Sequence, residues 1–322
     1  MSEEKKSYRE IFKATSLFGG VQAFNIVIAV VRSKFIAVLL GPEGMGISGL
    51  LISTTDFLGR LTNLGLGTSA VKNVAEASAT GDKERVSRVI TVLRRLVWAT
   101  GIIGLVLTIA LAPLLSKITF GNHDYTEAFI WISVTLLFQQ LTSGQLVILQ
   151  GLRKLEFLAR ANLLGSIIGL FITVPLYYFF GIDGIVPAII LVSFTSLVLA
   201  WIYSRKTGIS SVKISNRDTL HEGKDMMRMG FLLSLSGLIT LGASYIIRIY
   251  ISNVGGVEDV GLFNAGFAII NTYTGMIFTA MGTDYYPRLS AVASDNKRAG
   301  QLINQQAEIA ILILAPILSV FL

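Results

Sequence analysis

Long apolar segments recur along the whole chain, and they decide which solvent the protein folds in. A helix needs about 20 mostly apolar residues to cross the hydrocarbon core of a bilayer. The predicted spans are 14–40, 44–71, 96–116, 128–149, 161–180, 184–203, 229–254 and 260–286, with a ninth beginning near Leu302. A soluble helical protein has no means of covering so many segments. We therefore predict an all-α integral membrane protein with many crossings.

The composition excludes several other classes of protein. Charged residues make up 15% of the chain and there is no cysteine, which excludes disordered chains, disulfide scaffolds and cysteine-ligated metal sites. The two histidines, His123 and His221, lie in loops that we predict on opposite sides of the membrane, so they cannot share a metal ion. No loop is long enough to carry a soluble active site with paired carboxylates. We therefore expect no catalysis, no cofactor and no nucleic-acid partner.

The positive charges predict an orientation. Of the 27 lysines and arginines, four lie within predicted spans and one, Lys117, lies in a predicted outer loop. The others lie in the segments predicted inside, which are 1–13, 72–95, 150–160, 204–228 and 287–301. Cytoplasmic loops of membrane proteins carry an excess of Lys and Arg. The N-terminus is therefore predicted to be cytoplasmic. Three tryptophans close to span ends, Trp98, Trp131 and Trp201, fit the membrane interface.

An internal repeat predicts two related halves. At an offset of 215 residues, Gly41, Glu43 and Gly46 fall on Gly256, Glu258 and Gly261. Six spans separate the two copies, so both enter the membrane from the same side, as in transporters built from parallel repeats. The predicted organisation is a six-helix lobe at 1–203, a cytoplasmic linker at 204–228 and the start of a second lobe at 229–322.

Two halves of six helices would require three more helices after the ninth. The chain ends at Leu322 within apolar sequence, so we expect a truncated second lobe. The alternative is an eight-span protein with a re-entrant or interfacial tail.

Charged residues within the spans are the first candidates for a site. Each costs about 2.5–3.5 kcal/mol at the middle of a membrane helix on insertion scales, so each needs a partner, water or a function. The basic residues are Arg32, Lys34, Arg60 and Arg248. Shifting the repeat by one residue places Arg32 on Arg248, so a cavity with cations on both walls would suit an anion such as phosphate. The alternative is that these side chains snorkel to the interface or are structural.

The remaining charges within the spans are acidic. Asp56 lies four residues before Arg60, so the two can pair along one helix face. Asp284 closes the predicted span 260–286, where it can cap the helix end, pair with Arg288 or bind a coupling ion. Arg32 and Lys34 are about 200° apart around a helix, so they cannot share one face.

Four short segments, in order, carry a family resemblance. Their sequences are Gly41-Pro42-Glu43-Gly44-Met45-Gly46, Phe120-Gly121-Asn122-His123-Asp124-Tyr125, Gln150-Gly151-Leu152-Arg153 and Gly282-Thr283-Asp284-Tyr285-Tyr286-Pro287-Arg288-Leu289-Ser290. With the predicted topology, the chain resembles polysaccharide flippases of the O-antigen translocase type. These belong to the multidrug/oligosaccharidyl-lipid/polysaccharide exporter superfamily.

The resemblance implies a two-lobed transporter of the bacterial inner membrane that works by alternating access. Its substrate would be an undecaprenyl-pyrophosphate-linked oligosaccharide, such as an O-antigen or capsule repeat unit, driven by an ion gradient. Its partners would be that substrate, membrane lipids, a polysaccharide polymerase and chain-length proteins. Lys34 and Arg248 match family positions for cavity cations, whereas Arg32 and Arg60 are included because of their predicted depth. The sugar would need polar lining from residues such as Asn25, Gln22, Ser53, Thr54, Asn63, Ser234, Ser236, Thr240 and Asn271.

Three other functions are weighed against a flippase. A cation-coupled multidrug exporter of the same superfamily would prefer acidic cavity residues, and the charges within the spans here are mostly basic. A membrane glycosyltransferase or polymerase would need a sizeable loop with paired carboxylates. A scaffold subunit would have no use for buried cations.

Overall fold

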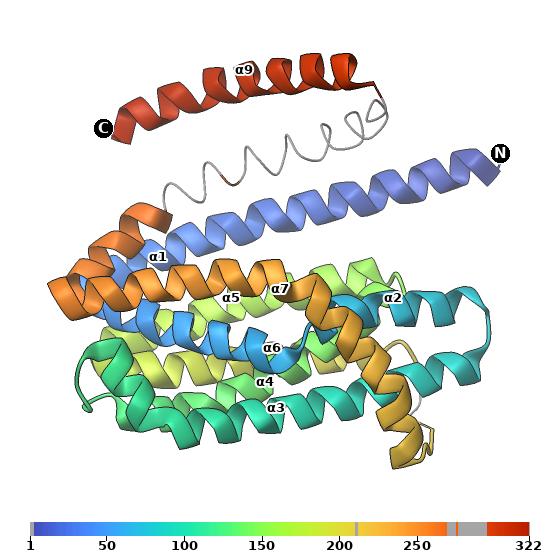
Figure 1. Ribbon diagram of the computed structural model, residues 1–322, viewed down its shortest axis with the longest axis horizontal. Coiled ribbons are helices and arrows are strands. Elements are labelled where there is room, and N and C mark those ends of the chain that lie inside the picture. Colours follow the sequence, from blue (N-terminus) through green and yellow to red (C-terminus); the bar gives the residue numbers. More distant parts are fainter. Residues whose placement is uncertain (1–2, 210–211, 269–274, 276–294, 322) are drawn as a thin grey trace. The chain divides into compact units, whose positions relative to one another are not determined.

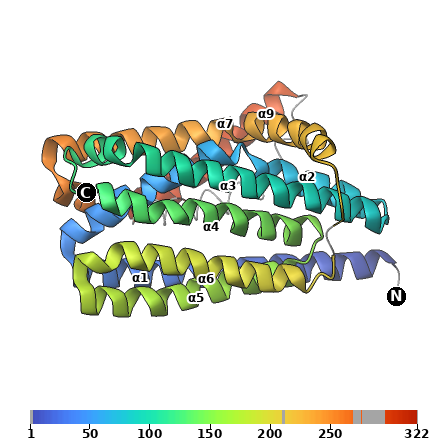
Figure 2. The ribbon, with the colours of Figure 1, turned by 90° about the horizontal axis from the view of Figure 1, so that it is seen from below.

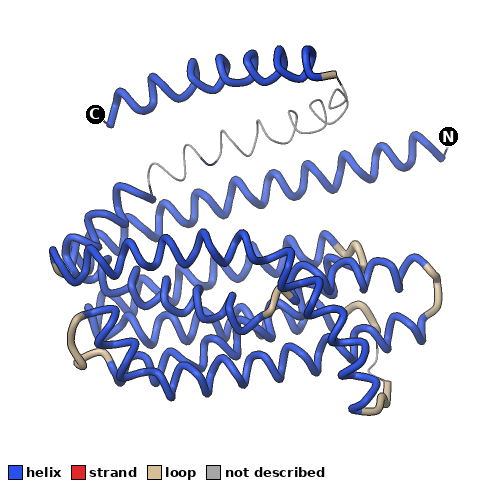
Figure 3. Tube along the Cα trace, in the orientation of Figure 1, coloured by secondary structure: helices blue, strands red, loops and turns tan. Residues whose placement is uncertain are grey.

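The computed structural model describes residues 3–209, 212–268, 275 and 295–321 (Figure 1). The chain forms two compact units, Met1–Leu262 and Phe263–Leu322. The helices of the first unit are α1 (Glu3–Asn63), α2 (Leu66–Ala79), α3 (Lys83–Phe120), α4 (Thr126–Gly151), α5 (Leu155–Phe180), the short 3₁₀ helix η1 (Gly181–Gly184), α6 (Ile185–Arg205) and α7 (Asn216–Gly255). The second unit contains α9 (Asn296–Phe321). In the described part of the chain every regular element is a helix (Figure 3).

Within the described residues, five helical segments are long and apolar enough to cross a membrane. They are Phe24–Asn63, Lys83–Phe120, Thr126–Gly151, Leu155–Arg205 and Ser234–Gly255, and the first and fourth each contain most of two predicted spans. Large apolar side chains point outward along them, since Phe171, Ile239 and Ile246 are 73%, 65% and 66% exposed. Such a surface suits lipid rather than water. The prediction of an all-α, multi-pass membrane protein is confirmed.

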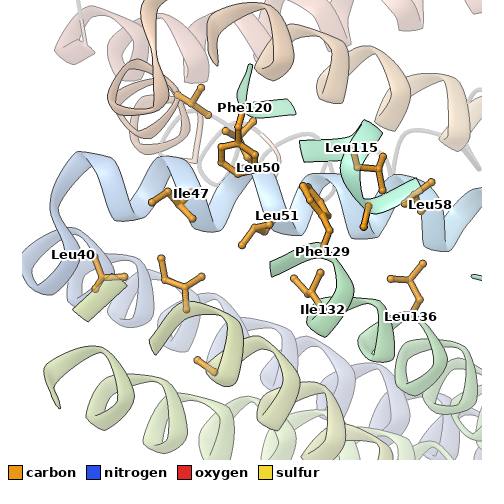
Figure 4. Packing of buried hydrophobic residues seen from close by; sticks show 14 of the residues in the cluster. Leu40, Ile47, Leu50, Leu51, Leu58, Leu115, Phe120, Phe129, Ile132 and Leu136 are labelled. Carbon is orange, nitrogen blue, oxygen red and sulfur yellow. The ribbon is translucent and has the colours of Figure 1, made fainter. Parts of the chain in front are cut away.

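A glycine divides α1 into two arms. Gly41 has φ 66° and ψ −169°, a conformation that glycine adopts at little cost, and Pro42 follows it without a backbone N–H. Figure 1 shows the chain reversing there, so that the two arms run antiparallel. The second arm then packs Ile47, Leu50 and Leu51 into the apolar cluster of Figure 4, beside α3 and α4.

The chain turns in the same way at the start of the predicted second half. Gly256 has φ 95° and ψ 177°, close to the values at Gly41. A Cβ atom on Gly46 would lie 1.9 Å from the carbonyl oxygen of Val257, and one on Gly261 would lie 1.9 Å from that of Pro42. The two contacts are reciprocal at the offset of 215 residues. Such a matched pair of contacts is what a repeat at this offset requires. The division of the chain into two lobes joined by a linker at 204–228 stays a prediction.

The predicted span 44–71 is not one continuous helix. Leu64 and Gly65 take positive φ values of 50° and 71°, so α1 ends at Asn63 and α2 begins at Leu66. A Cβ atom on Gly65 would lie 1.9 Å from the carbonyl oxygen of Gly230, so the break packs directly against the backbone of α7. Broken helices occur at membrane depth where the freed backbone groups line a cavity or are buried in protein.

Helix α4 lies at the centre of the first unit. It packs against α3 and α2 on one side and α6 on the other, and α5 packs against both α6 and α1. Figure 2 shows the first arm of α1 together with α5 and α6 below α4, with α2, α3 and α7 above it. Different side chains of α4 can therefore line spaces on either side of this helix. The candidate site depends on this position.

Candidate functional site

A cavity of about 500 Å³ lies between α1, α2, α4 and α7. Its lining is almost entirely polar or glycine, and consists of Asp56, Gly59, Arg60, Asn63, Gly65, Gly67, Thr68, Gln139, Gln140, Ser143, Ser234 and Leu241. The break between α1 and α2 forms one wall. A space with such a lining inside a membrane protein can hold water or a polar ligand.

Two of the predicted charged residues, Asp56 and Arg60, line this cavity, and Arg248 interacts with one of them. Asp56 interacts electrostatically with both Arg60, one turn along α1, and Arg248 of α7. The guanidinium of Arg248 also donates hydrogen bonds to the backbone oxygen of Ser244, at 3.0 Å, and to its hydroxyl. The group therefore carries two cations and one anion, and its formal net charge is positive.

Amide side chains hold the helix break in place. Gln140 is buried and its Nε2 donates to the backbone oxygen of Gly59 at 2.8 Å. Asn63 Nδ2 donates to Gln140 Oε1, and Asn63 Oδ1 accepts from the backbone N–H of Gly67 at 3.2 Å. This network links the end of α1, the start of α2 and the middle of α4. Its loss would leave several polar groups unpaired at membrane depth.

Arg32 lies in a second cavity of about 400 Å³. This cavity is lined by Asn25, Arg32, Thr142, Leu146, Ala161, Asn162, Gly165, Ser166, Val192, Ser196 and Ala200, from α1, α4, α5 and α6. The Nε atom of Arg32 and the Oδ1 atom of Asn25 are buried, and neither has a hydrogen-bond partner within the described ranges. Buried polar atoms of this kind call for water or a ligand.

A third cavity, of about 430 Å³, has lining residues in common with each of the other two. It shares Gly67, Gln139 and Ser143 with the first cavity, and Thr142, Leu146, Val192 and Ser196 with the second. The α4 residues that line these spaces recur at three- and four-residue intervals, which places them on one helix face. The three cavities thus adjoin one another along α4, from Arg60 in the first to Arg32 in the second, and we call this row of cavities the path along α4.

The other predicted site residues have different surroundings. Lys34 is exposed and lies on none of the three cavities described above, although it is only two residues from Arg32. Asp284 falls outside the described residues. Arg32 and Arg248 do not share any of these three cavities: Arg32 lines the second, and Arg248 interacts with Asp56. No cluster of three or more His, Cys, Asp or Glu residues that could hold a metal occurs among the described residues.

Sequence reasoning missed the contribution of α4. Asn63 and Ser234 were expected to line a polar space and they do, but Gln139, Gln140 and Ser143 were not singled out. The available signal was the pair of adjacent amides within the apolar span 128–149. Amides at membrane depth are costly unless they are paired or face a wet space.

The two adjacent glutamines are expected to respond differently to substitution. Gln140→Leu removes both bonds that cross from α4 to α1, so it should destabilise the protein by about 1–3 kcal/mol. Gln139→Leu changes a half-buried residue that lines the cavity and should leave stability nearly unchanged. Thermal unfolding of the purified variants in detergent would show this difference. Equal unfolding temperatures for the two variants would contradict the role given to Gln140.

Residues 11–293 match the family model described as polysaccharide biosynthesis protein. The chain belongs to this family. Its curated relatives are transporters and flippases by name. A Shigella flexneri protein named as an O-antigen transporter is 23% identical over 308 residues, which are 94% of this chain and 71% of the relative. The lipid III flippase of Escherichia coli is 23% identical over 259 residues, 80% of this chain and 62% of that protein. This polysaccharide biosynthesis protein thus spans only part of the length of each relative.

Solved transporters share the fold. An inward-facing multidrug resistance MATE family transporter of the MOP superfamily aligns with a TM-score of 0.60 and 19% identity, over 90% of this chain and 67% of the transporter. A mutant of a MATE protein aligns with a TM-score of 0.62 and 20% identity, over 94% of this chain and 69% of that protein. At this identity the likeness concerns the fold alone. It agrees with the resemblance to the exporter superfamily seen in the sequence.

Proposed function

We propose that this protein moves a lipid-linked oligosaccharide from the cytoplasmic to the periplasmic leaflet of the bacterial inner membrane. The observation that carries the proposal is the polar path along α4 with Asp56, Arg60 and Arg248 at one end. The family of polysaccharide biosynthesis proteins, and the names of the relatives, support this class of cargo.

The chemistry of the path suits a lipid pyrophosphate that carries sugars. Phosphate oxygens need charged donors, and Arg60 and Arg248 offer two guanidinium groups that both interact with the carboxylate of Asp56. Sugar hydroxyls need both donors and acceptors, which amides such as Gln139 and hydroxyls such as Ser143 and Thr142 supply. The polyprenyl chain, which we propose to be undecaprenyl, can remain in the bilayer while the polar head moves.

Each charged residue then has a proposed role. Arg60 and Arg248 bind the pyrophosphate, and Asp56 sets the position of both cations or takes up a coupling ion. Arg32, at the far end of the path, offers an unused Nε donor to the same headgroup or to a sugar. Lys34 and Asp284 remain candidates for binding and coupling because of the family resemblance.

The setting of the protein is also part of the proposal. The positive charges favour a cytoplasmic N-terminus in the inner membrane. A flippase of this type would deliver its cargo to a polysaccharide polymerase and to chain-length proteins on the periplasmic side. The lobes would alternate access around the central path, powered by an ion gradient.

Gene deletion followed by complementation tests the function. Without the gene, surface polysaccharide should disappear and the lipid-linked repeat unit should accumulate in the inner leaflet. Complementation with the native gene should restore surface polysaccharide, and the Arg248→Gln variant should restore far less of it at equal protein level. Unchanged polysaccharide in the deletion strain, together with increased sensitivity to organic cations, would contradict the proposal and favour a multidrug exporter.

A further inference from the structure

A basic pocket lies where α3 meets the segment that links α6 to α7. It has a volume of about 520 Å³ and is lined by Thr91, Arg94, Arg95, Trp98, Val212 and Lys213. None of these six described lining residues is acidic. The pocket shares no residue with the three cavities of the transport path, so it requires an explanation of its own.

Like charges concentrate around this pocket. The guanidinium of Arg94 interacts electrostatically with that of Arg205, at the end of α6. Arg205 in turn lies over the ring of Trp201, with its guanidinium carbon 3.9 Å from the ring centroid. Lys213 adds a further cation on the linker side. Several cations gathered in one place attract an anion.

Hydrogen bonds fix both walls of the pocket. The backbone N–H of Val212 donates to Thr91 Oγ1 at 3.1 Å, which fastens the linker to α3. Arg95 Nη1 donates to Thr219 Oγ1 at 2.8 Å, which fastens the start of α7 to the same helix. The pocket is therefore formed by the protein itself and does not depend on a ligand to assemble it, which lowers the cost of binding.

Two exposed indoles favour a place for the pocket at the level of lipid headgroups. Trp98 and Trp201 are 51% and 43% exposed. Trp98 lies at the start of the predicted span 96–116, and Trp201 lies four residues before the end of α6. Tryptophan favours the interface between hydrocarbon and water. A basic pocket between α3 and the linker at this depth matches the phosphate of a lipid headgroup in both charge and position.

We propose that this pocket binds the phosphate headgroup of an anionic phospholipid. Arg94 and Lys213 hold the phosphate between α3 and the linker, while Trp98 packs against the glycerol region. This lipid is distinct from the transported substrate, because the residues that bind it lie outside the transport path. It fastens the linker to the first six helices and stabilises them.

Lipid titration of the purified protein tests the proposal. Native mass spectrometry would follow the binding of phosphatidylglycerol, with phosphatidylcholine as the zwitterionic comparison and inorganic phosphate as a soluble competitor. Each of Arg94→Gln and Lys213→Gln should weaken phosphatidylglycerol binding about fivefold, and the pair roughly thirtyfold. Lys213 lies in an exposed connection, so its variant keeps the test valid if Arg94→Gln folds poorly.

Arg160→Gln is the matched control, because Arg160 is an equally basic, 58% exposed side chain that pairs with Glu156 on α5. It should leave phosphatidylglycerol binding unchanged. If Arg160→Gln weakened phosphatidylglycerol binding as much as the pocket variants do, the lipid would be attracted to basic surface in general, and the proposal would be overturned. Lipid binding unchanged in the double variant would also overturn it. Displacement of the lipid by millimolar inorganic phosphate would assign the pocket to a soluble phosphate instead.

Discussion

Alanine at Gly46 or Gly261 is expected to force apart the two helix starts at residues 42–46 and 257–261. Each added methyl carbon would lie 1.9 Å from a backbone carbonyl oxygen of the other helix start, and backbone atoms cannot move aside as a flexible side chain can. The end of the first unit that carries Gly41 should therefore stay open. We expect transport to be lost because a transporter that cannot close this end cannot alternate.

A single introduced cysteine would measure that opening. The chain contains no native cysteine, so Ser234→Cys would place one reporter on the wall of the first cavity. In cells, a membrane-impermeant maleimide should label it at least tenfold faster when Gly46→Ala is present, which corresponds to about 1.4 kcal/mol in favour of the open state.

Gly20→Ala provides the control for this experiment. Gly20 is also a glycine of α1, but a Cβ atom there would have no neighbour within 4 Å. Labelling and transport should therefore stay at the native level. If Gly46→Ala and Gly261→Ala behaved like Gly20→Ala, the close contact would have no part in closing this end.

Replacing Arg60 by glutamine is expected to reduce transport by one to two orders of magnitude. A hydrogen bond to a charged group contributes about 1.5–3 kcal/mol, and the phosphate would lose such a partner. Folding should survive the change, because Asp56 keeps its electrostatic interaction with Arg248. Arg60→Lys retains the charge without the planar fork, so its transport should fall between the native protein and Arg60→Gln.

The rate of substrate flipping in reconstituted vesicles, normalised to protein, is the measurement that separates these variants. Arg160→Gln removes an exposed arginine outside the path and should transport at the native rate. If Arg60→Gln transported at the native rate, Arg60 would not bind the substrate, and the polar path would lack its main cation.

The sequence predicted the main features of the membrane fold because they follow from local chemistry. Apolar length alone indicates helices that cross a bilayer, and the five segments found in the structure agree with it. The reversals at Gly41 and Gly256 were also predictable, since the repeat placed glycines at both positions. In the structure both glycines have positive φ. Asn63 and Ser234 were recognisable as polar residues with no reason to face lipid.

The tertiary structure decided how the charged residues are grouped. The sequence could pair Asp56 with Arg60, four residues away, but its interaction with Arg248 depends on how α7 packs against α1. The packing of α1 against α4, α5 and α6 puts Arg32 in the second cavity and brings Gln140 of α4 to the end of α1. Hydropathy and spacing fix which solvent each segment meets. They do not fix which faces of distant helices meet, because that depends on side-chain shape and on contacts between residues far apart in the chain.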